Sequence, residues 1–343
     1  MKKLQILVPQ YKETDEKLQN LLDSIELQQG VNFDDFEVLI MNDGTDIYLS
    51  QDFLNYYTYN IQYYKNKHLG ISGTRNSLMK KATAEYIMFC DSDDMFISSL
   101  ALYTIFQEMQ QHPFDLLIAP FMEETKAYTL DNKGNRVIID KFIYIEKGVK
   151  DKDGVDSTFI HGKVYNRNFL EKNNIQWRTE LKCNEDSHFN SLCINLAQKV
   201  LYVPKPYYLY KWNEGSVTKP ENVQNYRITT YQYFFWSEDF IIQDLIDRGL
   251  SDRARKYIAI LIYDGYYFFH YIENTDQERY DYLKSIYAGL YKKYVDTFNS
   301  IPIDELNKTI DQIKLKYTYR QAPKTIDLDF STWIEKEILP CIQ

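Results

Sequence analysis

The stretch Tyr86-Ile-Met-Phe-Cys-Asp-Ser-Asp-Asp94 decides the fold of the first part of this chain. Its five apolar residues predict a buried strand over 86–90, which ends in three carboxylates within four residues. Carboxylates this close repel each other unless a cation lies between them. Mg²⁺ and Mn²⁺ prefer such oxygen ligands, and open α/β sheets bind ligands at the carboxyl ends of their strands. The stretch therefore predicts a metal site at a sheet edge.

The first 120 residues alternate between strand and helix patterns. This alternation predicts right-handed crossovers and an α/β fold, Rossmann-like, with a mostly parallel sheet and flanking helices. Polar, turn-rich residues over 126–156 predict a hairpin or a mobile flap. Strands are expected over 4–8, 36–41, 61–64, 86–90 and 116–121, and helices over 16–28, 47–55, 72–80 and 98–111.

A second domain is expected, because 343 residues exceed the usual size of one domain. Beyond residue 219 the chain is rich in tyrosine, and 228–246, 252–272 and 278–299 have apolar residues at helical spacing. We therefore expect a catalytic domain over 1–219 and an α-helical domain over 220–343. The helical domain would either bind an acceptor substrate or mediate assembly into oligomers. The tyrosines are expected to pack with wet hydroxyls, and a sugar-stacking platform is the alternative.

Charge and cysteine content disfavour several classes of protein. The net charge of −9 lacks the basic excess that a phosphate backbone requires, so nucleic acid is an unlikely partner. The four cysteines show no zinc or CxxC spacing, which predicts reduced packing thiols. No apolar run approaches the roughly 20 residues of a membrane span, and the first one ends at Pro9, too early for a signal peptide. A soluble, cytoplasmic protein is expected.

Two polar motifs follow the earlier strands. Asn42-Asp43-Gly44-Thr45 comes after the second strand, so Asp43 is expected at the same sheet edge as Asp91. Asp43 either caps a turn or accepts hydrogen bonds from a base or a ribose. In the segment His68 to Asn76, two glycines lead into a helix expected to start at Ser72 or Thr74. Its Arg75 either clamps a phosphate or orients the aspartates.

A second acidic pair, Glu185-Asp186, stands before an apolar helical run over 189–196. An acid at this place most often caps the helix, but a carboxylate in a cleft is also what a general base requires. His161 lies beside a Gly-Lys turn and fits either a structural histidine or a metal ligand. We leave His161 and His68 without an assigned role.

The order of these motifs resembles the family 2 glycosyltransferases, which have the GT-A fold, over about residues 1–220. The resemblance is carried by Ile6-Leu-Val-Pro9-Gln-Tyr11, Asn42-Asp43-Gly44-Thr45, Gly70-Ile-Ser-Gly-Thr-Arg75-Asn76, Asp91-Ser-Asp93-Asp94, His161-Gly162-Lys163-Val-Tyr165 with Phe169-Leu170, Asn184-Glu185-Asp186 with Phe189, and Tyr208-Leu-Tyr210 followed by Gly215-Ser216-Val-Thr218.

The resemblance implies a nucleotide site built from the earlier motifs. Pro9, Tyr11 and Asp43 would line the base pocket, and Glu13 would join that wall. Asp91 would meet the ribose. The matched residues thus predict a nucleotide-sugar donor.

The resemblance also implies contacts to the diphosphate. Arg75 would brace the nucleotide site, and Lys211 with Ser216 would close over the diphosphate. Lys211 offers a point charge where many relatives carry an arginine, whose planar fork binds phosphate in a bidentate way. The chain also departs from the family at Asn42, where an Asp is usual, and at His68, where an Asn is usual.

For the transfer step, the resemblance implies that Asp93, in a DxD motif, holds Mn²⁺ or Mg²⁺. Asp186 would be the base of an inverting transfer, and Glu185 would bind the acceptor. The leading hypothesis is a metal-dependent hexosyl- or N-acetylhexosaminyltransferase that uses a nucleotide sugar, expected to be a UDP-sugar, and modifies a hydroxyl of a cell-surface glycan or its precursor. A covalent route stays open.

Two alternatives remain from the sequence. One is a glycosyltransferase that acts on protein or on modified DNA. The other is a catalytically silent module that binds a nucleotide or a glycan. The sequence determines neither the sugar and its linkage nor the oligomeric state.

Overall fold

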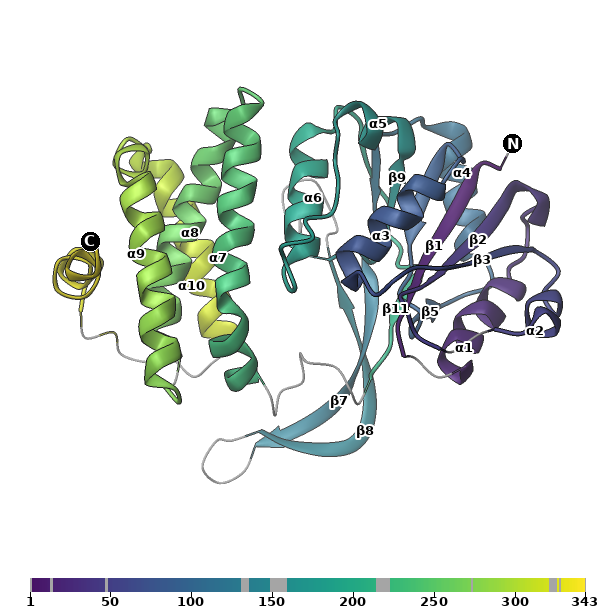
Figure 1. Ribbon diagram of the computed structural model, residues 1–343, viewed down its shortest axis with the longest axis horizontal. Coiled ribbons are helices and arrows are strands. Elements are labelled where there is room, and N and C mark those ends of the chain that lie inside the picture. Colours follow the sequence, from purple (N-terminus) through teal and green to yellow (C-terminus); the bar gives the residue numbers. More distant parts are fainter. Residues whose placement is uncertain are drawn as a thin grey trace. The chain divides into compact units, whose positions relative to one another are not determined.

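Strand β1 (Leu4–Gln10) lies inside a seven-stranded sheet in the computed structural model (Figure 1). All of its residues are buried, and it pairs in parallel with a strand on each side. The predicted mostly parallel sheet is confirmed, with β9 as the antiparallel exception. The strands, in spatial order, are β10 (Val200–Tyr202), β6 (Leu116–Ile118), β9 (Lys163–Asn166), β4 (Tyr86–Phe89), β1, β2 (Phe36–Asn42) and β3 (Asn60–Lys65).

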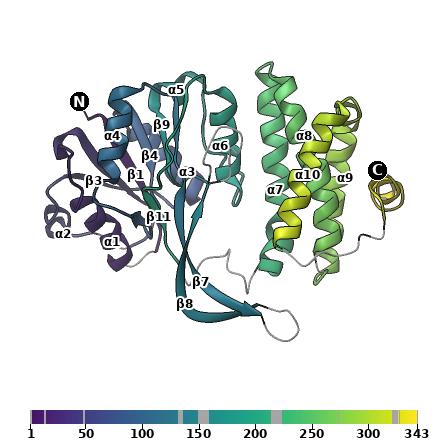
Figure 2. The same cartoon turned by 180° about the vertical axis from the view of Figure 1, so that it is seen from behind.

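Helices cover both faces of this sheet (Figures 1 and 2). Because strand side chains alternate between faces, Ile6 and Val8 share one apolar cluster with α1, and Leu7 shares another with Leu78 of α3. The predicted α/β architecture is therefore confirmed. The first face carries α1 (Asp15–Glu26), α2 (Gln51–Asn55) and α4 (Ala101–Gln111), and the second carries α3 (Gly70–Lys81), α5 (Arg167–Lys172) and α6 (Glu185–Leu196).

A second sheet of four strands carries a long hairpin, which projects from the first sheet in both views (Figures 1 and 2). For the strand expected over 116–121, the predicted end is wrong. The strand stops at Ile118, because Pro120 cannot donate to a ladder, and Phe121 begins the hairpin instead. The predicted hairpin is confirmed. In spatial order the strands are β5 (Met95–Phe96), β11 (Tyr208–Tyr210), β7 (Phe121–Leu130) and β8 (Arg136–Lys147).

The residues group into two compact units, 1–215 and 216–343. The second unit is helical, as predicted, and its core is rich in buried aromatic rings. Tyr231 and Phe268, for example, stack with ring centroids 3.6 Å apart. The expectation of wet tyrosine hydroxyls is wrong for part of this core, because Tyr287 is fully buried and its hydroxyl donates to the Ile262 carbonyl at 2.7 Å. The helices are α7 (Val223–Asp247), α8 (Ser251–Tyr271), α9 (Gln277–Asn299), α10 (Ile303–Arg320) and α11 (Phe330–Trp333), with short helical turns at Ile334–Ile338 and Leu339–Cys341.

The structure describes residues 2–12, 15–46, 49–130, 136–148, 159–213, 223–272, 274–320, 326 and 328–342. Two predicted site residues, Glu13 and Ser216, lie outside these ranges, as does the domain boundary expected between 219 and 220. None of the helices in the described ranges combines the length and the apolar character that crossing a membrane requires.

Gly162 permits the chain to approach β6 closely as it enters β9. Its φ is +69°, and an added Cβ would lie 2.4 Å from the carbonyl oxygen of Ala119. We expect Gly162→Ala to lower the free energy of unfolding by about 2 kcal/mol or more, because a strained φ and a backbone clash add. Urea unfolding measures the loss.

The matched control is Gly30→Ala. Gly30 has φ +73°, but its added Cβ would meet only the ring of Tyr103, a side chain that can move. Equal losses in the two variants would contradict the close approach at Gly162.

Candidate active site

A cavity of about 290 Å³ lies where β1, β2 and β4 end and α3 begins. It gathers predicted site residues that are up to 84 positions apart in the chain, from Pro9 to Asp93. The sequence-based expectation that the strand ends share one edge accounts for this convergence. The lining residues are Pro9, Gln10, Tyr11, Asp43, His68, Gly70, Ile71, Thr74, Arg75, Asp91 and Asp93.

Asp43 fastens the start of α3 to the end of β2. Its carboxylate accepts hydrogen bonds from the backbone N–H groups of Leu69 at 2.7 Å and Gly70 at 2.9 Å. The helix therefore begins at Gly70 and not at Ser72 or Thr74 as predicted. The cap comes from a residue 26 positions away, so a local cap signal could not reveal it.

Arg75 of α3 is the central cation of the site. Only 3% of its side chain is exposed, and its guanidinium donates to Asp91 at 3.1 Å, Glu185 at 3.1 Å and Asp186 at 2.6 Å. Burial by itself would lower the pKa of Arg75, but the three carboxylates raise it. These contacts fit the predicted alternative in which Arg75 orients the acids.

An aromatic layer supports the guanidinium. Trp177 lies 4.5 Å from the Arg75 guanidinium carbon and stacks on Phe189 of α6 at 4.0 Å. The Asn76 side chain fixes Trp177 through both backbone groups, donating at 2.8 Å and accepting at 2.9 Å. Arg75 therefore binds the carboxylates, and the next residue, Asn76, positions the Trp177 ring that supports the guanidinium.

Asp186 lies in the first turn of α6, with 24% of its side chain exposed. Burial raises the pKa of Asp186 well above its usual range, and Glu185 and Asp91 add to the rise while Arg75 opposes it. Neither acid is the N-cap, because that position is held by Asn184 in the left-handed conformation. The capping alternative for this pair is therefore wrong. The carboxylates of both acids accept hydrogen bonds from Arg75 instead.

Asp93 and Asp94 are held by the segment that follows β11. The Asn213 amide donates to Asp93 at 2.7 Å, and the Lys211 backbone N–H donates to Asp94 at 2.9 Å. Tyr208 also donates to the fully buried Asp94 at 2.6 Å. The structure thus brings Lys211 to the acidic turn through its backbone, which the sequence did not predict.

The acids fit a divalent cation. In the described part of the chain, ligand atoms of Asp91, Asp94 and His161 lie within 4.8 Å of one another. Burial raises the pKa of Asp93 and of Asp94, and the charge of Asp91 adds to both rises. Bringing a cation to such crowded carboxylates relieves their repulsion. The predicted ligand Asp93 is not part of the cluster of Asp91, Asp94 and His161, although it lines the cavity beside Asp91.

His161 is buried between aromatic rings. Tyr208 and Tyr210 each stack on it with centroids 4.9 Å away. Burial lowers the pKa of His161 to about 4, so its imidazole is neutral at neutral pH. Its Nδ1 has no hydrogen-bond partner and lies 3.9 Å from an Asp94 oxygen. A neutral imidazole is the form that binds metals.

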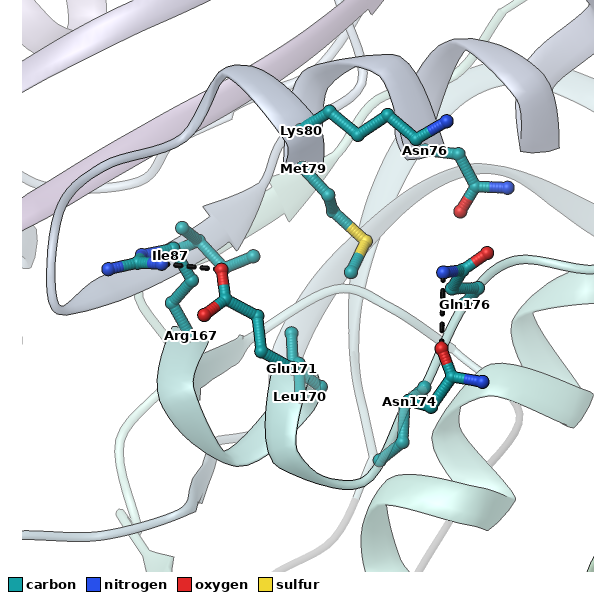
Figure 3. Close-up of a pocket in the computed structure, with 10 residues that line it drawn as sticks. Asn76, Met79, Lys80, Ile87, Arg167, Leu170, Glu171, Asn174 and Gln176 are labelled. Atoms are coloured by element: carbon teal, nitrogen blue, oxygen red, sulfur yellow. Dashed lines mark hydrogen bonds and ion pairs between the residues drawn. The ribbon is translucent and has the colours of Figure 1, made fainter.

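A second cavity, of about 230 Å³, lies between α3 and α5 (Figure 3). Met79 of α3 reaches into this cavity. Glu171, which also lines the cavity, forms an ion pair with Arg167. None of the predicted site residues lines this cavity. We therefore assign the candidate active site to the cavity that contains Asp43, Asp91 and Asp93.

Comparison with known families now places the N-terminal unit. Residues 5–173 match the model of Glycosyl transferase family 2. These residues form a family 2 glycosyltransferase domain. The resemblance inferred from the motifs is confirmed, and the matched range contains the whole acidic turn and Arg75.

Two curated relatives of this glycosyltransferase domain come from bacilli. The uncharacterised glycosyltransferase EpsJ of Bacillus subtilis is 26% identical over 223 residues, which cover 62% of this chain and 62% of EpsJ. A poly(ribitol-phosphate) beta-glucosyltransferase of Bacillus spizizenii is 24% identical over 343 residues, covering 92% of this chain and 48% of that protein. The chain therefore spans less than two thirds of either relative.

Among solved structures, TarS 1–349 from S. aureus has a similar fold. The TM-score is 0.63 at 17% identity, covering 96% of this chain and 95% of TarS 1–349. TarS 1–349 has also been solved in complexes with UDP and with UDP-GlcNAc. The likeness confirms the predicted fold class, a GT-A glycosyltransferase domain followed by a helical region.

Sequence reasoning missed three residues that shape the site. Trp177, Tyr208 and Asn213 each contact a predicted site residue from a distant part of the chain. The sequence did contain a signal for Tyr208, because this residue belongs to a motif that matches the family. Trp177 and Asn213 had none, since their partners lie 102 and 120 positions away.

Replacing Arg75 tests the buried clamp. At pH 8 we expect Arg75→Met to lower the free energy of unfolding by about 3 kcal/mol or more, because three carboxylates lose their shared cation. Arg75 opposes the rise that burial gives the pKa of Asp186, so without Arg75 this folded-state pKa lies still further above that of the unfolded chain. Protonation then favours the folded state, so the deficit shrinks as the pH falls toward 5. Urea unfolding at both pH values measures this.

Arg178→Met serves as the control for Arg75→Met. Arg178 is 34% exposed and lies 3.9 Å from Glu180, so its loss should cost little at either pH. A deficit for Arg75→Met that is independent of pH, or no larger than that of the control, would refute the clamp.

Proposed function

We propose that this chain is a metal-dependent, inverting glycosyltransferase that moves a sugar from a UDP-sugar to a hydroxyl of a cell-surface glycan or its precursor. The observation that carries the proposal is the Arg75 clamp. One buried cation joins Asp91, at the donor cavity, to the acid pair Glu185-Asp186. A site that holds donor and acceptor groups in one geometry is what a direct transfer needs.

The cavity supports a nucleotide donor. Pro9, Tyr11 and Asp43 offer an apolar wall with one carboxylate, which suits a base that has both ring faces and N–H groups. Asp91, which also lines the cavity, then accepts from the ribose hydroxyls. The complexes of TarS with UDP and UDP-GlcNAc support uridine as the nucleoside.

Asp93, next to Asp91 in the cavity lining, is the proposed ligand of Mn²⁺ or Mg²⁺. When bound, the ion neutralises negative charge on the departing diphosphate. Arg75 contributes no charge of this kind, because its guanidinium is already shared among carboxylates. We further propose that Lys211 and Ser216 close over the diphosphate.

Asp186 is the proposed general base. Its raised pKa makes it a stronger proton acceptor than an exposed aspartate, while Arg75 keeps it oriented. The acceptor hydroxyl loses its proton to Asp186 as its oxygen forms a bond to the anomeric carbon. The bond from that carbon to the diphosphate oxygen breaks on the opposite face, so the configuration inverts. Glu185 binds the acceptor beside it.

The acceptor is proposed from the relatives. The name of the Bacillus spizizenii relative gives poly(ribitol-phosphate) as its acceptor and glucose as its sugar. TarS has been crystallised with UDP-GlcNAc. We therefore propose a hexosyl or N-acetylhexosaminyl transfer to a cell-surface polymer, with the helical unit contributing to acceptor binding or assembly. The expected cytoplasmic location stays a prediction.

Asp186→Asn keeps the shape of the side chain and removes its basicity. We expect kcat for sugar transfer to fall by about 100-fold or more, while Kd for UDP changes less than about 3-fold. Release of UDP from the donor in the presence of acceptor measures kcat, and calorimetry measures Kd. Asp46→Asn, at a fully exposed aspartate, is the control. Unchanged turnover in Asp186→Asn would remove this residue from the mechanism.

Asp93→Asn tests the metal ligand. In wild-type protein, Mn²⁺ should increase the rise in melting temperature that UDP produces, because ligands that bind the folded state stabilise it. We expect Asp93→Asn to lose this Mn²⁺-dependent part and to keep the part produced by UDP alone. A thermal-shift series with UDP, UDP-glucose and UDP-GlcNAc, each with and without Mn²⁺, makes the comparison. A full Mn²⁺ effect in the variant would exclude Asp93 as a ligand.

A further inference from the structure

His68 and Tyr11 form a stacked pair of rings in the lining of the donor cavity. Their centroids are 4.5 Å apart and their planes differ by 18°. The pair joins two segments far apart in sequence, the end of β1 and the turn before α3. Tyr11 is 40% exposed and the His68 side chain is 58% exposed, so the stacked pair lies at the surface of the cavity and not in the apolar core.

Each of the two rings is partly covered by its neighbours. Tyr11 is covered by His68 and also has the Lys12 ammonium 5.0 Å from its centroid. The His68 side chain is 58% exposed although it stacks on Tyr11. His68 therefore lines the cavity with much of its side chain still open to a ligand.

His68 is also held in place before any ligand arrives. Its Nδ1 lies 2.9 Å from a carboxylate oxygen of Asp43, the residue that caps α3. Gly44, with φ +81°, lets the preceding loop pack on the His68 backbone, where an added Cβ would lie 2.5 Å from the His68 nitrogen. A ring fixed by two neighbours loses little freedom when a ligand stacks on it.

The charges around His68 point to a neutral, flat ligand group. A phosphate here would face the Asp43 carboxylate. Arg75, which lines the cavity, is already shared among three acids, and the Lys12 ammonium lies over the Tyr11 ring. A nucleobase has no charge to repel and offers a π-face to an aromatic ring.

We propose that the nucleobase of the donor stacks on His68, and that Tyr11 and Asp43, besides lining the base pocket, hold this ring in place. The inference rests on the proposed function, because it assigns one part of the same nucleotide site.

Substitutions of His68 separate stacking from other roles. His68→Ala removes the ring, and His68→Phe keeps a ring while removing the hydrogen bond to Asp43. His112→Ala removes an exposed histidine outside the cavity and serves as the control. Calorimetry with full-length protein and Mn²⁺ would use two probes, UDP and pyrophosphate, of which only UDP carries a base.

We expect His68→Ala to weaken UDP binding by about 5- to 100-fold, the range for the loss of one base-stacking ring. His68→Phe should stay within about 3-fold of wild type, and pyrophosphate should bind equally to all variants. Unchanged or tighter UDP binding in His68→Ala overturns the proposal. So does a loss in His68→Phe as large as in His68→Ala, because the polar contact to Asp43 would then matter and not the ring.

The result also separates this inference from the proposed function. If folded wild-type protein binds neither UDP nor UDP-sugars, the proposed function fails. If wild type binds UDP and His68→Ala binds it equally well, the function stands and the stacking role of His68 is refuted.

Discussion

The candidate site depends on one buried cation among three acids. Arg75 is almost fully buried, and a guanidinium in such a place requires carboxylate partners. It has Asp91 on one side and Glu185 with Asp186 on the other. The two groups come from different parts of the domain, the turn after β4 and the start of α6. Because Arg75 satisfies both, neither acidic segment can move without leaving a charge unpaired.

Smaller constraints place Arg75 itself. Asp43 fixes the first residues of α3, so the helix begins at Gly70 and Arg75 falls near the end of its second turn. Asn76 holds Trp177 under the guanidinium, and Phe189 stacks on the other side of that ring. The start of α3, the layer of rings and the acid pair are therefore parts of one packed arrangement. Such an arrangement keeps Asp91 and the Glu185-Asp186 pair at a fixed separation.

The acidic turn shows how neighbouring carboxylates acquire different roles. Asp91 and Asp93 line the cavity, whereas Asp94 is fully buried and accepts from Tyr208 and from the Lys211 backbone. Asp94 thereby attaches β11 to the turn. Asp93, held by Asn213, links the segment after β11 to the proposed metal ligand. The chain near Lys211 is thus connected to the acids through hydrogen bonds that a side-chain motif does not encode.

The sequence by itself determined the α/β fold and the edge of the sheet that carries the candidate site. It did so because strand and helix periods are local, and because parallel strands bring their carboxyl ends together. Only the tertiary structure decided that Asp43 caps a helix 26 positions away, that Arg75 binds three acids, and that His68 stacks on Tyr11. These contacts join residues that no local pattern relates, since side-chain hydrogen bonds and ring stacking depend on how the elements pack.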